Sequence, residues 1–177
     1  MGVRTVITGH RADGISTFVS DEVVEPVYAP LLGGVAVSEL WGEDDIPSLP
    51  TSGERKKLNG FFPAARGYRI GIAVYPPQSH VPEEITDFDA ALAETERLLP
   101  GVTAAVTDKE GMHATDTVDL QYILEGEIHV TMDSGEETVL KPGDLLVMNG
   151  TNHAWANQHP DQPCRVLMVF IGGERRA

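Results

Sequence analysis

The chain has 177 residues, of which 13 are Lys or Arg and 27 are Asp or Glu, so its formal net charge is -14. This length fits one domain with a substantial core, and we expect a single domain over residues 1–177. The excess of acidic side chains repels phosphate backbones and anionic lipid surfaces, so neither nucleic acid nor a membrane is expected as a partner.

Cys164 is the only cysteine, which rules out an intramolecular disulfide and a zinc site built from several cysteines. A single thiol suits a reducing compartment. No apolar run approaches the length of a membrane span, and residues 1–10 lack the apolar segment of a secretory signal. We therefore expect a cytoplasmic protein.

The first 60 residues combine short β-like runs with one long polar segment. Residues 4–10, 17–20 and 34–41 have the composition of strands, whereas residues 44–60 are polar and interrupted by Pro and Gly. We expect N-terminal strands that pack on the rest of the domain, followed by a loop.

From Gly67 onward, apolar runs of strand length follow one another at short intervals. These runs are "YRIGIAVYPP", "LQYILE", "EIHVTM", "ETVLK", "LLVM" and "CRVLMVFIG". Gly135, within "MDSGEE", can take the positive φ of a hairpin turn. Many short strands separated by such turns favour an all-β sandwich or barrel.

One segment departs from the β pattern, and its spacing predicts an amphipathic helix over about residues 86–99. Its apolar side chains at helical spacing are Ile85, Phe88, Leu92 and Leu99. Thr86 is a suitable N-cap, acidic residues occupy the first turn, and Pro100 followed by Gly101 ends the helix. The sequence thus predicts one helix inserted between strands.

Two groups of residues in the C-terminal half follow a fixed spacing. In the first, His113 is followed by Asp119, which lies seven residues before Gly126. The second group consists of Gly143, Gly150, His153 and Asn157. Over residues 66–172 this pattern resembles the two motifs of the cupin superfamily. The resemblance implies a double-stranded β-helix barrel, with residues 1–60 as an N-terminal extension and the helix as an insertion.

The sequence also departs from the cupin motifs at three places. Thr115 stands where the family has a second histidine, and Asp119 stands where it usually has a glutamate. The usual Pro-x-Gly turn is shortened to Asn149-Gly150. One of the family's usual metal ligands is therefore absent from this chain.

The candidate metal ligands are His113, Asp119 and His153. A straight strand would hold His113 and Asp119 roughly 20 Å apart, at about 3.3 Å per residue, so they meet only if the segment between them turns. If His153 joins them, two imidazoles and one carboxylate form the facial arrangement typical of iron(II). Iron is our first choice of metal, and zinc, manganese or nickel would also be accepted.

The same region supplies candidates for contacts with a substrate. Thr115 and Gln121 are candidate catalytic residues that could hydrogen-bond a small molecule, and Trp155, Tyr75 and Asn157 are candidate pocket residues. The alternatives are structural: Asp119 would then hold a turn, His153 would be a capped loop residue, and Thr115 and Gln121 would be ordinary buried polar groups.

"MHATDTVD" together with "GTNHAWAN" is similar to small single-domain cupins, several of which are encoded near secondary-metabolite genes and are described as oxidoreductases. We expect a metal-dependent enzyme acting on a small carbonyl, phenolic or carboxylate compound, with oxygenase or dioxygenase chemistry as the first choice. Non-oxidative chemistry, namely decarboxylation, isomerisation or cyclisation, and non-catalytic binding of a small molecule are the alternatives.

The resemblance also implies a homodimer, because cupins commonly pair strands across subunits, and the N-terminal extension would be the exchanged piece. The inserted helix has two interpretations. It could cover the barrel mouth as a lid, or it could cover apolar outer surface or a dimer contact.

Overall fold

The computed structural model describes residues 2–106 and 111–175. Within these two stretches there are eleven strands, one α-helix and two short 3-10 helices. The strands are β1 (Val3–His10), β2 (Ser16–Val24), β3 (Val27–Tyr28), β4 (Ala36–Glu43), β5 (Tyr68–Tyr75), β6 (Thr117–Glu125), β7 (Ile128–Met132), β8 (Glu137–Leu140), β9 (Leu145–Asn149), β10 (His153–Ala156) and β11 (Cys164–Gly172). The predicted all-β class with one inserted helix is confirmed.

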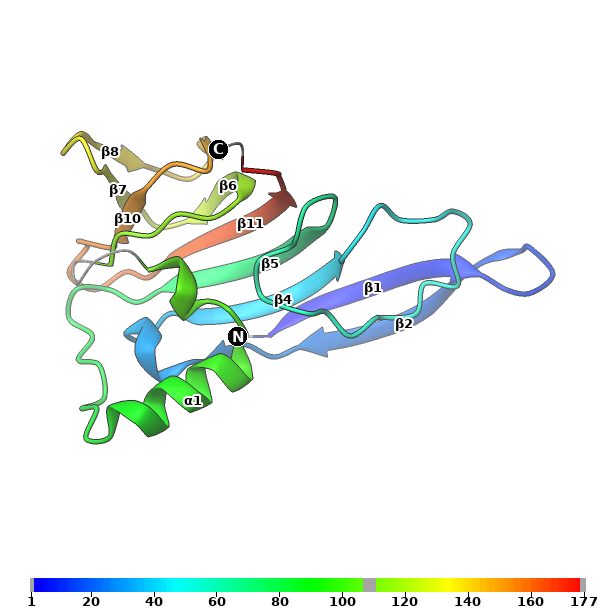
Figure 1. Cartoon of the computed structure of the whole chain (residues 1–177), viewed down its shortest axis with the longest axis horizontal. Helices are drawn as coiled ribbons and strands as arrows, with labels where there is room; N and C mark the ends of the chain where they lie inside the picture. The colour runs from blue at the N-terminus through cyan, green and yellow to red at the C-terminus, as the bar shows by residue number, and fades with distance from the viewer. Residues whose placement is uncertain (1, 107–110, 176–177) are drawn as a thin grey trace.

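Two antiparallel sheets curve towards each other to form a barrel (Figure 1). The larger sheet has the order β3-β4-β5-β11-β6-β9, and the smaller sheet has the order β10-β7-β8. Ile123 and Val166 of the larger sheet pack with Ile128 and Val130 of the smaller sheet in one buried cluster. The core therefore lies between the sheets, where each apolar strand buries alternate side chains.

Strands β3 and β4 belong to the barrel sheet itself, although the sequence placed them in the N-terminal extension. Val37 of β4 stands opposite Ala73 of β5, and both are buried. The predicted strand over residues 34–41 corresponds to β4, whose inward side chains are apolar. It extends the larger sheet by pairing with β5. The barrel sheet thus begins with β3 at Val27, about 40 residues before the predicted boundary at residue 66.

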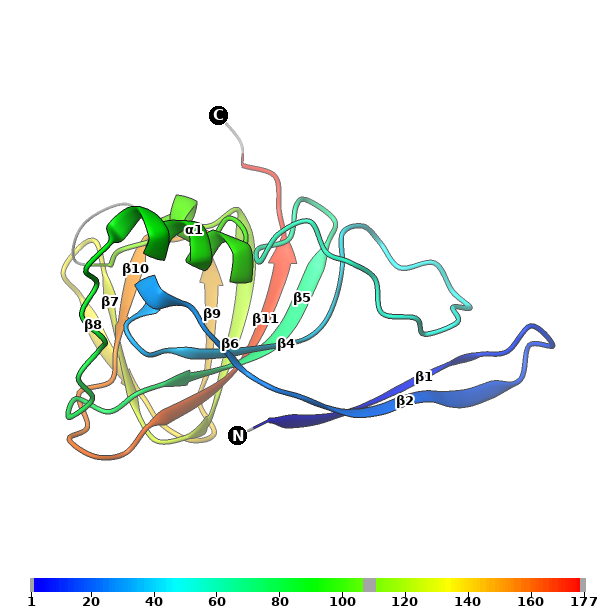
Figure 2. The same ribbon diagram turned by 90° about the horizontal axis from the view of Figure 1, so that it is seen from below.

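Strands β1 and β2 form a separate two-stranded sheet, which we call the arm. Figures 1 and 2 show the arm running away from the barrel on the side of β4. A bidentate ion pair between Arg4 and Asp21 joins its two strands, with both N–O distances at 2.8 Å. The N-terminal strands were expected to pack on the barrel, but the arm extends beyond it.

The inserted helix α1 (Phe88–Leu98) lies within the predicted range, but its N-cap is Asp87 rather than Thr86. The Asp87 carboxylate accepts a hydrogen bond from the backbone N–H of Ala90. The buried face of the helix carries Ala91 and Thr95, whereas the predicted apolar residue Phe88 is exposed.

Thr95 is fully buried. Its hydroxyl still has a hydrogen-bond partner, because it accepts from the backbone N–H of Leu31 in the 3-10 helix η1 (Pro30–Leu32). Just beyond the helix, Leu99 is buried in the core cluster that includes Val37, Ala73 and Met168. The C-terminal end of the helix is therefore anchored in the barrel core. In the described parts of the chain, no helix has the length and apolarity needed to cross a membrane.

Arg69 of β5 anchors the polar segment between β4 and β5. Its buried guanidinium donates hydrogen bonds to the carbonyls of Gly60, Glu43 and Tyr68, and it also pairs with the Asp44 carboxylate. Each of the three guanidinium nitrogens of Arg69 therefore has a protein acceptor, which compensates for the loss of hydration when the charge is buried. The second 3-10 helix, η2 (Thr103–Ala105), follows α1 and leads towards the candidate site.

Candidate functional site

His113 and His153 lie opposite each other in an antiparallel bridge. The backbone N–H of each residue donates to the carbonyl of the other, with N–O distances of 2.9 Å and 3.0 Å. Their imidazole centroids are 4.2 Å apart. The two histidines that are 40 positions apart in the sequence are therefore neighbours in the structure.

A tight turn brings His153 to this position. Gly150 follows β9 with a φ of 64°, a left-handed conformation that glycine adopts without steric cost. The chain reverses there and continues as β10, which begins at His153 and pairs with β7. The shortened turn at Asn149-Gly150 therefore has a direct structural role.

Both imidazoles are held in one orientation by backbone carbonyls. Nδ1 of His113 is 3.0 Å from the Gly111 carbonyl oxygen, and Nδ1 of His153 is 2.9 Å from the Thr151 carbonyl oxygen. A carbonyl only accepts, so Nδ1 carries the proton and Nε2 keeps its lone pair. Histidines that bind metals are usually fixed by such a contact at their other ring nitrogen.

Electrostatics keeps the His153 imidazole neutral. Burial lowers the pKa of His153 to about 4, and the neighbouring His113 lowers it further, while the Thr151 carbonyl acts in the opposite direction. A neutral imidazole is the form that donates an electron pair to a metal ion or a proton. At neutral pH, His153 is therefore ready to act as a ligand or as a base.

Asp119 lies at the end of a line of three buried polar side chains. Thr117 donates a hydrogen bond of 2.5 Å to Asp119 Oδ1, and so it accepts the 2.6 Å hydrogen bond that Thr115 donates. Burial raises the pKa of Asp119 to about 6, and the bond from Thr117 only partly offsets this effect. A carboxyl group with such a pKa can exchange a proton near neutral pH.

The segment between His113 and Asp119 turns from one sheet to the other. His113 is bridged to β10 of the smaller sheet, whereas Thr117 already belongs to β6 of the larger sheet. The chain crosses between the sheets at Ala114 to Asp116. Thr115, Thr117, Asp119 and Gln121 then share one buried face.

The expected three-ligand set is only partly assembled. Over residues 2–106 and 111–175, no group of three or more His, Cys, Asp or Glu side chains is arranged to hold a metal ion. The donor chemistry of His113 and His153 fits a metal, because both imidazoles are fixed at Nδ1 and no hydrogen bond within the described residues engages either Nε2. Asp119 is tied to Thr117 and is not part of one donor group with them.

Gln121 and two aromatic residues complete the interior around the site. Gln121 is 4% exposed, and its side chain lies on the buried face of β6 that also carries Thr117 and Asp119. Burial raises the pKa of Tyr75, and the charges of Cys164 and Asp119 raise it further, so the phenol stays protonated. The ring of Trp155 lies 5.9 Å from that of Tyr75 and 5.7 Å from that of His153.

Asn157 braces the turn that follows β10. Its amide nitrogen donates to the carbonyls of Tyr75 and Gln162, and its side-chain oxygen accepts from the backbone N–H of His159. All of its polar atoms are thus engaged with the backbone. It therefore links the end of β10 to the end of β5, where Tyr75 lies.

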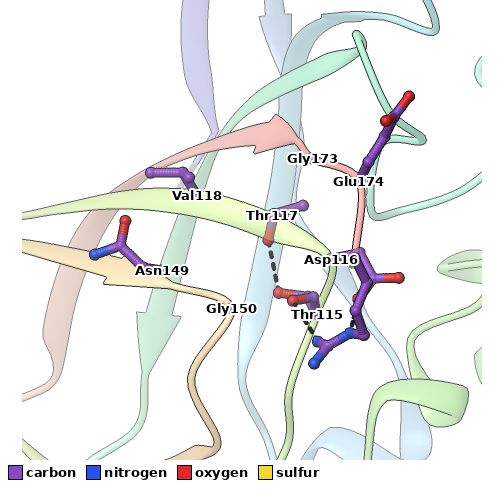
Figure 3. A pocket seen from close by; sticks show the side chains of 9 residues that line it. Thr115, Asp116, Thr117, Val118, Asn149, Gly150, Gly173 and Glu174 are labelled. Atoms are coloured by element: carbon purple, nitrogen blue, oxygen red, sulfur yellow. Dashed lines mark hydrogen bonds and ion pairs between the residues drawn. The ribbon is translucent and has the colours of Figure 1, made fainter. Parts of the chain in front are cut away.

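A cavity of about 220 Å³ opens at the end of β6 where the Thr115 and Thr117 hydroxyls lie (Figure 3). The C-terminal segment closes one side of it, because Arg175 pairs with Asp116 and donates to the Thr115 carbonyl at 3.3 Å. The two hydroxyls therefore connect this cavity with the buried carboxyl of Asp119.

Two residues of the site were not singled out from the sequence. Thr117 orients Asp119, and its place between Thr115 and Asp119 in the period-two pattern was the signal that could have identified it. Arg175 lies in a polar tail that carries no pattern. Cys164, in contrast, was correctly set aside: it is buried, and burial raises the pKa of its thiol to about 12.

Comparison with known proteins identifies the fold family. Residues 102–170 match the family model of the Cupin domain. This part of the chain therefore carries a cupin domain. The match covers β6 to most of β11 together with both histidines of the pair, so the resemblance found in the sequence is confirmed.

Several fungal cupin proteins are similar to the chain. The Phomopsin biosynthesis cluster protein C' of Diaporthe leptostromiformis is 49% identical over 60 residues, which is 34% of this chain and 32% of that protein. The chain thus aligns with only about a third of the length of this relative. The cupin-domain-containing oxidoreductase srdB of Neurospora crassa is 26% identical over 165 residues, covering 93% of this chain and 71% of that protein.

Solved cupin structures are also similar. The cupin domain of Schizosaccharomyces pombe Cnp3 has a TM-score of 0.47 at 9% identity, with 96% of this chain and 87% of that chain covered. A putative ethanolamine utilization protein Q from Salmonella typhimurium has a TM-score of 0.46 at 12% identity, covering 98% and 99% of the two chains.

Proposed function

We propose that the protein is a cupin oxidoreductase that acts on a small oxygenated molecule in the barrel interior. The observation that carries this proposal is the bridged pair of His113 and His153, whose Nδ1 atoms are fixed while their Nε2 atoms remain unengaged. The similarity of most of the chain to cupin-domain-containing oxidoreductases of Neurospora crassa and Aspergillus ruber supports it.

The two Nε2 atoms are the proposed donors for a divalent metal ion, with iron(II) as the first choice and zinc, manganese or nickel as the others. Such an ion would polarise an oxygen atom of the substrate or, if it is iron, exchange electrons with it. Asp119, which the sequence also suggested as a ligand, is assigned to proton transfer because, within the described residues, it does not complete a three-residue donor group with the two imidazoles.

The other side chains of the interior bind and orient the substrate. Gln121 offers an amide with N–H donors and a carbonyl acceptor, and Tyr75 offers a protonated phenol. Asp119 can hold or release a proton at Oδ2, because its Oδ1 is occupied by Thr117. Trp155 supplies an apolar wall. These groups suit a small carbonyl, phenolic or carboxylate compound.

A second candidate is non-oxidative proton transfer, as in an isomerase, cyclase or decarboxylase. The observation that favours it is Asp119, a buried carboxyl with a pKa of about 6 that two hydroxyls link to an open cavity. Such a group can act as a general base close to neutral pH. Oxygen consumption during turnover separates the two candidates, because only the oxidoreductase needs an electron acceptor.

The proposal is tested by metal binding to tag-free protein that has been stripped and then incubated anaerobically with iron(II). We expect about one equivalent in the wild type, and loss of at least ~10-fold in affinity for His113→Ala and for His153→Ala. His129→Ala is the control, because the imidazole of His129 in β7 contacts Glu137 in β8 and is not part of the His113–His153 pair. Equal binding by all variants, or no binding, would remove the metal from the proposal.

A further inference from the structure

A second cavity of about 220 Å³ lies between β4 and the polar segment that follows it. The side chains that line it come from β4, from residues 55–58 and from the end of helix α1, and they are Glu39, Trp41, Arg55, Lys56, Leu58 and Pro100. In the larger sheet, β5 and β11 separate β4 from β6, the strand that carries Asp119. This cavity, which we call the β4 pocket, is therefore distinct from the site at the imidazole pair.

Glu39 forms the inner end of the β4 pocket. It stands opposite Gly71 of β5 in register, and it also lines a void of about 10 Å³ together with Met168 and Phe170 of the core. This void has room for one water molecule at most, so the pocket ends at the Glu39 carboxyl. Burial raises the pKa of Glu39, and the charge of Arg69 partly offsets this rise. A hydrogen-bond donor on a ligand would compensate the carboxyl for the water that it has lost.

Trp41 forms the middle wall of the β4 pocket. Its indole N–H donates to the hydroxyl of Tyr68 at 3.0 Å, which fixes the plane of the ring. The guanidinium of Arg55 lies 5.8 Å from the ring centroid, and Leu58 and Pro100 add apolar surface. Such a wall suits a planar ring. A cavity of about 150 Å³ accommodates benzene, so the β4 pocket has the volume for one ring with small substituents.

Two cationic side chains complete the lining. Arg55 donates to the Leu40 carbonyl at 2.5 Å and to the Glu22 carboxylate of the arm at 3.2 Å. Lys56 donates to the Glu43 carboxylate at 2.7 Å. These contacts hold both cations in place, while a guanidinium has five donors and an ammonium has three. The side chain of Lys56 is 61% exposed, so its end of the pocket can accept an anionic group that stays partly hydrated.

We propose that the β4 pocket binds a small aromatic hydroxy acid, with its hydroxyl donating to Glu39, its ring against Trp41 and its carboxylate at Lys56. An acceptor, an aromatic wall and a cation follow one another along the lining, in the order of the groups of such a molecule. A neutral hydroxyl is favoured over an ammonium group at Glu39, because the charge of Arg69 acts on the same carboxyl. The pocket is separate from the imidazole pair and does not rest on the function proposed for it.

Calorimetric titration of the metal-free full chain with 4-hydroxyphenylacetate tests the proposal. We expect the wild type to bind one equivalent, and we expect Glu39→Met and Lys56→Gln each to bind on the order of 10-fold more weakly, because each loses one polar contact with the ligand. Lys57→Gln is the matched control, since it makes the same change in charge at the adjacent residue, which does not line the pocket. Circular dichroism establishes that each variant folds.

Two further ligands test the order of the groups. Phenylacetate lacks the hydroxyl, and 4-hydroxyphenylacetamide lacks the negative charge. We expect each to bind the wild type on the order of 10-fold more weakly than 4-hydroxyphenylacetate does. Glu39→Met should no longer distinguish phenylacetate from 4-hydroxyphenylacetate, because the acceptor of the hydroxyl is gone.

The indole N–H signals of the two tryptophans locate the ligand by nuclear magnetic resonance. Binding should shift the signal of Trp41 and leave that of Trp155, whose ring contacts His153, in place. His153→Ala should bind 4-hydroxyphenylacetate like the wild type. A shift of Trp155 with loss of binding in His153→Ala would place the ligand at the imidazole pair and overturn this proposal, but not the function proposed for that pair. Absence of saturable binding, or equal affinity in all variants, would also overturn it.

Discussion

The backbones of His113 and His153 are joined by two reciprocal hydrogen bonds, while their side chains bring two imidazole rings to 4.2 Å from each other. One residue precedes β6 and the other begins β10, so this bridge joins the two sheets at the candidate site. The position of the imidazole pair is therefore set by the backbone, and a substitution of either side chain leaves the bridge in place.

The first prediction concerns pH and Asp119. Its folded pKa of about 6 lies above the ordinary value of 3.8, so between these pH values the folded chain binds more protons than the unfolded chain. Asp119 therefore lowers stability as pH rises from about 4 to about 6, by on the order of 3 kcal/mol. Asp119→Asn removes this loss, because the amide does not ionise.

The neutral His153 acts in the opposite direction. Its folded pKa of about 4 lies below the ordinary value of 6.5, so stability is lost as pH falls from about 6.5 towards 4. The two effects oppose each other in the wild type. Metal-free Asp119→Asn should therefore lose more stability on acidification than wild type does, as measured by urea unfolding at several pH values. Parallel pH profiles for the two proteins would contradict this account.

The second prediction concerns Gln121. Its side chain is buried on the face that it shares with Thr117 and Asp119. Gln121→Leu, which keeps the size of the side chain, should weaken substrate binding and change the free energy of unfolding by less than about 1 kcal/mol. Lower affinity at unchanged stability is the signature of a binding residue. If Gln121→Leu destabilises the protein by more than this, the amide has a structural role instead.

The third prediction concerns Cys164. The thiol is fully buried and its pKa is about 12, so hardly any thiolate is present or accessible at neutral pH. Iodoacetamide should modify the native protein only as fast as the protein unfolds. Ser134→Cys, in the exposed turn between β7 and β8, should react at once and serves as the control. Rapid modification of Cys164 in the folded wild type would show that the barrel opens locally.

The fourth prediction concerns Arg69. Arg69→Met leaves the carbonyls of Gly60 and Glu43 and the Asp44 carboxylate without their buried partner. We expect a loss of about 3 to 5 kcal/mol in the free energy of unfolding, because one partner of a buried network has been removed. Arg66→Met removes only the exposed pair with Asp45 and should cost less than about 1 kcal/mol. Similar losses in both variants would mean that the network of Arg69 contributes little.

The sequence predicted the elements whose pattern is local. The alternation after Gly67, the hairpin at Gly135 and the spacing of Asp119 to Gly126 led to the barrel, which the structure and the family match confirm. The need for a turn between His113 and Asp119 followed from strand length alone, and the structure has that turn. These features depend on residues that are close to one another in the chain.

Features that depend on distant partners were harder to predict. The helix buries Thr95 rather than Phe88, because the Leu31 backbone supplies a hydrogen-bond donor that no local pattern reveals. The arm leaves the barrel although its strands have an ordinary composition. Asp119 accepts a hydrogen bond from Thr117, a contact that depends on side-chain orientation within the barrel.

An iron site at the His113–His153 pair is tested by electron paramagnetic resonance of the iron(II)-loaded protein with nitric oxide. Nitric oxide occupies open coordination positions as oxygen would. We predict the signal of an iron–nitrosyl species in the wild type and its loss in His153→Ala, with His129→Ala retaining it. Iron that binds without giving this signal, or a signal that survives the loss of His153, would contradict an oxidoreductase site at the His113–His153 pair.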